Sequence, residues 1–473
     1  MHDLLITGGF VVTMDPARRV IENGAVAITG NRITAVGPAA EVAGPAKTTI
    51  DAKGRAVLPG LIDGHAHAGH GLIKTMGGGD PNAWSKACET VYTVGSTPEF
   101  WRAEAALAAL ERLSFGVTCG VSLLGGGDSI MRSDDPAHGV GHAEGVAQVG
   151  IRAIMAVGPT RPLHPRIYAA WDGGSRRDYA VDFQRQYDTT EALLQSVHNT
   201  QNGRMRVCTL MPVFHDGEQP DATLALTEAQ GRKIRELGNR HGTFFHQDGH
   251  RQGSIARAEK LGLLGKDATL SHCTELTADD IAALIRTDTR VVHNPSAIAS
   301  VRGRCPAIEL MDAGVTVILG SDATAPDRSG DMFRHMFMAM RYHQRHFRDQ
   351  NVLPPGKALE MVTIDAARAM GMEHEIGSLE AGKKADVITV DLTQPHLYPP
   401  NMPLYRLVCF AVGQDVRDVV CDGALLMRDR RYTQADQGAI LEAAAAETET
   451  MLARTGLSHM LETPAGFWGR TRY

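Results

Sequence analysis

Between residues 59 and 70 the chain reads Pro59-Gly60-Leu61-Ile62-Asp63-Gly64-His65-Ala66-His67-Ala68-Gly69-His70. With residues 56–58 before it, this stretch is an apolar run that glycine interrupts and polar residues end, which is typical of a buried strand feeding a loop. In a strand, residues i and i+2 point to the same side, so His65 and His67 can present two imidazoles to one point. Such pairs also occur on protein surfaces, but a buried strand leading into the pair favours a metal site.

Four later strand-like runs also end in polar residues. The residues at their ends are His246, His272, His293 and Asp322. Any one of these histidines alone is more often a loop residue or a helix cap. Because the carboxyl ends of barrel strands meet at one face, the four residues and the first histidine pair together indicate a metal centre.

The segment from residue 58 to about residue 370 alternates short apolar runs with amphipathic stretches. Counting the run at Leu58, eight strand-to-helix units follow one another, which predicts an α/β fold of the (β/α)8 barrel type. Two longer segments, 74–98 and 158–188, appear irregular and are expected to shape the substrate pocket. The other expected strands are 117–123, 151–157, 205–213, 243–246, 269–272, 290–293 and 315–320, and the expected helices are 101–113, 189–198, 227–240, 254–264, 277–285 and 306–313.

The two ends of the chain carry a different pattern. Residues 1–57 hold short strands separated by Gly, Asn and Pro, and short strands return at 387–390 and in a hairpin around Asp422-Gly423. We therefore predict a small β-sandwich domain from residues 1–57 and 376–433, around a metal-binding barrel at 58–375. Residues 434–473 are expected to form a helix, 438–452, and a tail. The aromatic residues of the tail, Phe467, Trp468 and Tyr473, favour packing on a neighbour and predict a homodimer or a higher homo-oligomer.

Composition narrows the class of partner. The formal net charge of −6 provides no basic surface for nucleic acid, and no apolar run approaches the ~20 residues of a membrane span. The first residues lack a signal-peptide pattern, and the seven cysteines include no close pair. These features predict a cytoplasmic protein that acts on a small molecule.

The motifs quoted so far, with His293-Asn294-Pro295-Ser296, Gly320-Ser321-Asp322 and Gly382-Lys383-Lys384-Ala385-Asp386, resemble those of the amidohydrolase superfamily. The resemblance extends to about Tyr432 and is to the branch that holds triazine hydrolases and cytosine, guanine and adenosylhomocysteine deaminases. It implies that one divalent metal per subunit, zinc first and cobalt, manganese or iron as alternatives, is bound by His65, His67, His246 and Asp322. It also implies that His272 contacts the attacking water or the leaving group, while Asp322 accepts and returns a proton.

One departure from that branch bears on the substrate. Its deaminases carry a glutamate three residues after the histidine of strand five, where this chain has Gly249. Asp248 comes one residue early, and we do not expect it to face the substrate. The apparent loss of a ring-protonating acid favours hydrolysis of an amide, urea or carbamate C–N bond, similar to molinate hydrolase and the phenylurea hydrolases of this branch. The alternative is a deaminase or dehalogenase of an N-heterocycle.

Three further histidines are candidates for substrate contacts, namely His70, His250 and His293. His70 can instead be a residue of the pocket wall or a ligand of a second metal. The end of strand four, near residues 211–215, carries no lysine or glutamate that could bridge two metals, which favours one metal, although His272 with a neighbour could hold a second. A non-catalytic binding protein on a decayed barrel is the remaining class, and the intact metal-ligand set argues against it.

Overall fold

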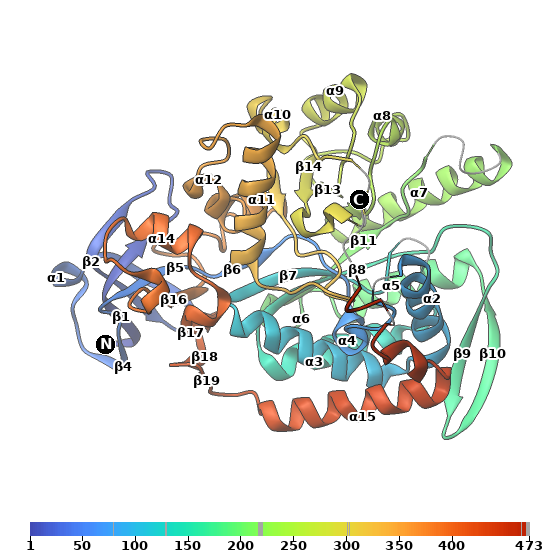
Figure 1. The fold of residues 1–473 in the computed structure, drawn as a ribbon, viewed down its shortest axis with the longest axis horizontal. Helices are drawn as coiled ribbons and strands as arrows, with labels where there is room; N and C mark the ends of the chain where they lie inside the picture. The colour runs from blue at the N-terminus through green and yellow to red at the C-terminus, as the bar shows by residue number, and fades with distance from the viewer. Residues whose placement is uncertain are drawn as a thin grey trace.

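A computed structural model gives the fold (Figure 1). It describes residues 1–78, 80–127, 130–215, 221–299, 301, 303–464 and 466–469. Two sheets organise the chain, one in the middle of the sequence and one that combines both ends. Within the described residues, none of the helices combines the length and the apolar character that crossing a bilayer requires.

The central sheet has eight strands, all parallel, and confirms the predicted barrel. Its path runs in chain order from β6 to β15, and its two edges meet where the Gly64 amide donates to the Leu319 carbonyl at 2.9 Å and the Asp322 amide donates to the His65 carbonyl at 2.9 Å. Each predicted barrel strand has its counterpart. The strands are β6 (Leu61–Asp63), β7 (Val117–Leu123), β8 (Arg152–Val157), β11 (Met205–Leu210), β12 (Phe245–Gln247), β13 (Ala268–Ser271), β14 (Arg290–His293) and β15 (Val317–Leu319).

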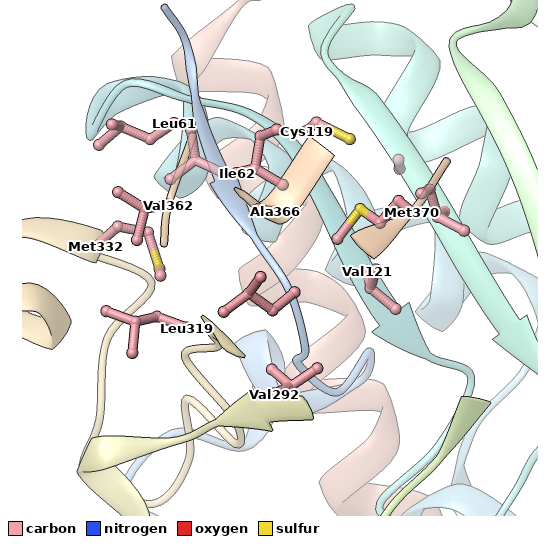
Figure 2. Packing of buried hydrophobic residues seen from close by; sticks show 14 of the residues in the cluster. Leu61, Ile62, Cys119, Val121, Val292, Leu319, Met332, Val362, Ala366 and Met370 are labelled. Carbon is pink, nitrogen blue, oxygen red and sulfur yellow. The ribbon is translucent and has the colours of Figure 1, made fainter. Parts of the chain in front are cut away.

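The apolar run that opens the barrel is two strands and not one. The first, β5 (Arg55–Pro59), belongs to the sheet that the two chain ends form, where it pairs with β1 (His2–Val12) and β16 (Val387–Asp391). The second, β6, pairs with β7 in the barrel. Figure 2 shows Leu61 and Ile62 of β6 among the buried side chains of one hydrophobic cluster, together with Val121 and Leu319. The chain therefore passes from one sheet to the other at Gly60, just before the histidine pair.

Helices surround the barrel strands, as predicted, and four of them were not anticipated. The first, α4 (Pro136–Val149), contains three glycines, which lower helix propensity and obscured the pattern. Those glycines allow close packing on α3 (Pro98–Ser114), since a Cβ at Gly145 would lie 2.2 Å from the Arg102 carbonyl oxygen. The other three are α11 (Met332–Phe347), α12 (Pro355–Glu360) and α13 (Ile364–Ala369). The remaining helices around the barrel are α5 (Phe183–Ser196), α7 (Asp221–His241), α8 (Ser254–Lys260), α9 (Ala278–Thr287) and α10 (Ala307–Asp312).

The two segments predicted to be irregular contain regular structure. Segment 74–98 includes α2 (Pro81–Thr90), and segment 158–188 includes a hairpin of β9 (Arg166–Asp172) and β10 (Ser175–Val181) that turns at Gly173-Gly174. The Trp171 indole donates to the Val94 carbonyl at 2.7 Å, and the buried Arg132 donates to carbonyls of both segments. The prediction of irregular loops was wrong because the hairpin strands carry no regular alternation of apolar and polar residues and are ordered by these contacts.

Both chain ends enter one nine-stranded sheet, as predicted. Its order is β19-β18-β17-β16-β5-β1-β2-β3, with β4 paired to β1, and the predicted hairpin around Asp422-Gly423 is its β17–β18 pair. The predicted sandwich and domain boundaries stay predictions. The strands not yet bounded are β2 (Val20–Thr29), β3 (Arg32–Pro38), β4 (Ala46–Asp51), β17 (Val416–Cys421), β18 (Ala424–Arg428) and β19 (Arg431–Tyr432).

The chain continues beyond this sheet into α15 (Gln437–Thr455), which packs on α3 along the lower edge of Figure 1. This helix confirms the one expected at 438–452. In the tail that follows, Phe467 is 62% exposed and Trp468 is 90% exposed. Tyr473 lies outside the described residues.

Candidate active site

The candidate site residues lie at the carboxyl ends of four barrel strands. His65 and His67 follow β6, His246 lies within β12, His272 follows β13, and Asp322 follows β15. All five side chains are buried. Parallel strands of a closed sheet bring these ends to one face, which is why positions far apart in the sequence meet here.

Three imidazoles converge on one carboxylate oxygen. The distance from the Asp322 Oδ1 atom is 3.1 Å to His67 Nε2, 3.7 Å to His65 Nε2 and 3.9 Å to His272 Nε2. Among the described residues, His65 Nε2 has no hydrogen-bond partner although it is buried. Burying such a nitrogen without a partner is costly, so this point of the site is suited to a ligand such as a metal ion.

Asp248 joins this cluster, contrary to our expectation that it would not face the site. Its Oδ1 atom lies 3.3 Å from His65 Nε2 and 3.3 Å from His272 Nε2, and its Oδ2 atom lies 3.6 Å from His67 Nε2. The Ser271 hydroxyl donates to Oδ1 at 2.8 Å. Strand β12 ends at Gln247, and Gly249 follows with a φ of +95°, so strand alternation no longer determines where the Asp248 side chain points.

His246, which the motif predicts as a metal ligand, lies against His65 and Thr269. Its Nε2 atom lies 2.8 Å from His65 Nδ1, and its Nδ1 atom lies 2.7 Å from the Thr269 hydroxyl. Both ring nitrogens therefore contact neighbours, and the ring is adjacent to the three converging imidazoles. Its role as a ligand stays a prediction.

Polar groups behind the cluster fix its orientation. The Gly125 carbonyl lies 3.1 Å from His67 Nδ1, and the Arg328 guanidinium donates to Asp322 Oδ2 at 2.5 Å. Deeper in the barrel, the Asp63 carboxylate accepts from the Ser321 amide and hydroxyl, at 2.9 and 2.7 Å, and from Arg112 at 3.0 Å, which joins β6 to β15. Such outer contacts set the direction of ligand atoms. Arg328 belongs to no sequence motif by which it could have been found.

The backbone is strained at two of these positions. Asp322 has a φ of +62° and His272 has a φ of +67°, in the left-handed region that side-chain-bearing residues rarely adopt. Strain of this kind costs on the order of 1–3 kcal/mol and persists where surrounding contacts impose it. Here it turns both side chains toward the cluster at the point where each strand ends.

Comparison with known proteins places this site in a family. A model of the amidohydrolase family matches residues 232–426. A 5-methylthioadenosine/S-adenosylhomocysteine deaminase of Syntrophobacter fumaroxidans is 30% identical over 459 residues, covering 93% of this chain and 96% of that protein. The chain belongs to the amidohydrolase superfamily. This membership confirms the predicted reaction class, hydrolysis of carbon–nitrogen bonds other than peptide bonds.

Further relatives of this amidohydrolase agree in fold. A 5'-deoxyadenosine deaminase of Methanosarcina acetivorans is 28% identical over 473 residues, covering 96% of this chain and 99% of that protein. The zinc-bound structure of an adenosine deaminase from Xanthomonas campestris has a TM-score of 0.81 at 24% identity, over 96% of this chain and 99% of that chain. An atrazine chlorohydrolase from Arthrobacter aurescens, complexed with zinc, has a TM-score of 0.77 at 21% identity, covering 94% of this chain and 100% of that chain.

Charge in the amidohydrolase cluster is balanced between acids and imidazoles. Burial opposes ionisation of both carboxyls, but neighbouring histidines, above all His65, hold the pKa of Asp322 and of Asp248 well below their usual range. Although burial acts in the opposite direction, contacts with these carboxylates raise the pKa of His67 and of His272. The two acids are therefore negatively charged oxygen donors that face histidine nitrogens.

The three histidines predicted to contact substrate lie around the cluster. The His70 ring is 5.1 Å from the His67 ring and 5.2 Å from Trp84, which places it in the wall beside the first histidine pair. His293 Nε2 lies 3.2 Å from His343 Nε2, and His250 contacts Ser254 and Gln247. Burial lowers the pKa of each, to about 3 for His250. Their contact with substrate stays a prediction.

A buried acid behind the histidine loop makes stability depend on pH. Burial raises the pKa of Glu104 from 4.5 to about 7, and its carboxylate accepts from the Gly71 amide. Because the folded protein binds this proton more tightly than the unfolded chain, its contribution to stability is complete below about pH 4.5 and is lost as pH rises through about 7. The shift corresponds to about 3 kcal/mol. We expect Glu104→Gln to reduce the loss of thermal stability between about pH 5 and about pH 8.

The control for that measurement lies on the same helix. Glu99 is exposed in the first turn of α3, so Glu99→Gln removes a carboxylate without changing a buried group. Melting curves of the three proteins, recorded by circular dichroism, give the comparison. An unchanged pH dependence in Glu104→Gln would show that burial does not raise the pKa of this acid above its value in the unfolded chain.

Proposed function

We propose that this amidohydrolase hydrolyses an amide, urea or carbamate C–N bond of a small molecule with the help of one divalent metal ion per chain. The observation that carries the choice of substrate is Gly249. No atom described by the structure lies within 4 Å of the point where its Cβ would be, and the position provides no acid for a ring nitrogen. Cleavage of an acyl C–N bond needs only a nucleophile, a group that polarises the carbonyl and a proton for the amine.

The donor set fits a divalent metal. Ligand atoms at ~2.0–2.1 Å from a tetrahedral zinc lie roughly 3.3 Å apart, and several nitrogen–oxygen separations in the cluster are close to that value. Imidazole with carboxylate suits zinc, cobalt, manganese or iron. The proposed ligands are His65, His67, His246 and Asp322. The chemistry that such an ion supplies is Lewis acidity, which lowers the pKa of water from ~15.7 toward ~7.

The protein's own residues divide the remaining work. Asp322 is ionised and buried, so it can accept the proton of the attacking water and return it to the departing amine. His272 can polarise the substrate carbonyl or hold the attacking water from the opposite side of the cluster. His70, His250 and His293 are proposed to line the substrate pocket. Burial of these side chains keeps bulk water away from the reacting bond.

A second candidate is deamination of an adenosine-type nucleoside. The relatives named above support it, because two of them are deaminases of modified adenosines. The position of Asp248 also supports it, since this carboxylate could take the place of the glutamate that Gly249 lacks. The similarity to molinate and phenylurea hydrolases, like the cytoplasmic location, stays a prediction.

The two candidates release different products. We would reconstitute the enzyme with zinc and assay ureas, carbamates and anilides for the released amine, and aminopurine nucleosides such as 5'-deoxyadenosine for ammonia. Amine release from the first group, with no ammonia from the second, supports the proposal. Ammonia release from nucleosides alone would overturn it in favour of deamination.

Assembly gives a separate prediction. The exposed Phe467 and Trp468 lead us to expect at least a dimer in solution, because aromatic side chains with this exposure favour an interface. Truncation after Gly456 removes the tail and should lower the mass measured by light scattering. A full-length protein that is already a monomer would contradict the prediction.

A further inference from the structure

The feature that the proposed mechanism leaves unused is the carboxylate of Asp248. Its two oxygens lie 3.3–3.6 Å from the Nε2 atoms of His65, His67 and His272. The side chain is 11% exposed and lies among polar groups. A carboxylate held among three histidines requires an explanation, because burying it without a cation is costly.

Direct hydrogen bonding does not account for this arrangement. His65 Nε2 lies 3.3 Å from Asp248 Oδ1, yet it has no hydrogen-bond partner among the described residues. The nitrogen and the oxygen are therefore close without being aligned on each other. Two donors separated in this way fit a shared cation, since ligand atoms of one tetrahedral zinc are roughly 3.3 Å apart.

The groups behind Asp248 resemble the outer contacts of a metal ligand. The Ser271 hydroxyl donates to Oδ1 at 2.8 Å, and the Asn294 amide donates to that hydroxyl at 2.9 Å. This chain of contacts fixes one oxygen and leaves Oδ2 directed toward His67. Ligating carboxylates are commonly oriented by such outer contacts.

We infer that Asp248 is a further ligand of the divalent metal, in addition to His65, His67 and Asp322. The inference rests on the metal site of the proposed function. It has a consequence for the substrate, because with both Asp322 and Asp248 on the metal neither carboxylate of the cluster is a separate acid for a ring nitrogen. Asp248 as a ligand therefore favours acyl C–N bonds, whereas a metal-free Asp248 would favour the deaminase.

The test measures metal binding and not activity. Metal-free wild type, Asp248→Asn and Asp279→Asn are titrated with zinc against a competing chromophoric chelator, and bound zinc is counted by elemental analysis. Asp279 is an exposed carboxylate on α9 and provides the matched control. Because loss of an outer contact alone weakens metal affinity about 10- to 100-fold, we expect Asp248→Asn to lose more than about 100-fold in zinc affinity and Asp279→Asn to match wild type.

Each outcome separates the inference from the proposed function. Wild type that binds no zinc would refute the metal site itself. Zinc affinities of wild type and Asp248→Asn that differ by less than about 100-fold would overturn only the role of Asp248 as a ligand, because loss of an outer contact explains such a difference. Should Asp248→Asn fail to fold, a crystal structure of zinc-loaded wild type decides. An Asp248 oxygen at ~2.0–2.2 Å from zinc supports the inference, and a carboxylate outside the coordination sphere overturns it.

Discussion

Asp322→Asn is expected to lower turnover by about 100- to 10,000-fold or more, which is the range of general acid–base contributions alone. The substitution keeps the size of the side chain but removes its charge. Asp322 faces His67 Nε2 at 3.1 Å through one oxygen and accepts from Arg328 at 2.5 Å through the other. The change therefore removes a charged metal ligand and the group proposed to carry the proton.

Steady-state kinetics on the substrate found by the panel would measure this loss, with zinc content determined in the same preparation. Asp327→Asn is the matched control, because Asp327 lies in the same loop and its side chain is 78% exposed. The control should retain the activity of wild type. Substantial hydrolysis by zinc-loaded Asp322→Asn would exclude Asp322 as the proton carrier and move that role to another residue, with Asp248 the nearest carboxylate.

Removal of the metal is expected to abolish turnover completely. The buried histidines and carboxylates supply donor atoms within 4.8 Å of one another, and without a cation they leave the attacking water unactivated. Dialysis against a chelator should give inactive protein, and zinc, cobalt or manganese should restore activity. Because binding to the folded state alone stabilises it, by about 2.7 kcal/mol at a ligand concentration of 100 Kd, metal removal should also lower the melting temperature.

The chelator itself needs a control, since it can inhibit by binding in the pocket. Passing the treated enzyme through a desalting column and assaying it before and after zinc addition distinguishes the two effects. Full activity in a preparation that elemental analysis shows to be free of metal would refute metal dependence. If zinc restores activity to wild type but not to Asp322→Asn, the metal-dependent activity also requires the Asp322 carboxylate.

The barrel and most of its site could be predicted because the relevant information is local. A buried parallel strand is a short apolar run, and the polar residue that ends it lies at the carboxyl edge of the sheet. His65, His67, His272 and Asp322 were each found as such an ending, and closure of the sheet brings them within 4 Å of a shared oxygen or of one another. Closure of the barrel brings these strand ends together independently of the sequence of the loops.

Other features depended on contacts between distant segments. The hairpin β9–β10 is ordered by Trp171 and Arg132, which reach segment 91–95, and no periodic apolar pattern marks it. The break between β5 and β6 was hidden because both strands are buried and apolar, so a single run covers two sheets. Helix α4 was not predicted because its glycines lower helix propensity, although they allow close packing on α3.

By itself, the sequence determined the fold class and the candidate ligands at the strand ends, because apolar runs and the residues that end them follow the geometry of a parallel barrel. The reaction class followed from the resemblance of its motifs to the amidohydrolase superfamily. Only the tertiary structure decided where Asp248 points and that His246 contacts His65 Nδ1. The direction of a side chain beyond the end of a strand depends on the turn that follows and on the partners that surround it. For Asp248 these are the positive φ of Gly249 and the hydroxyl of Ser271, which comes from the neighbouring strand.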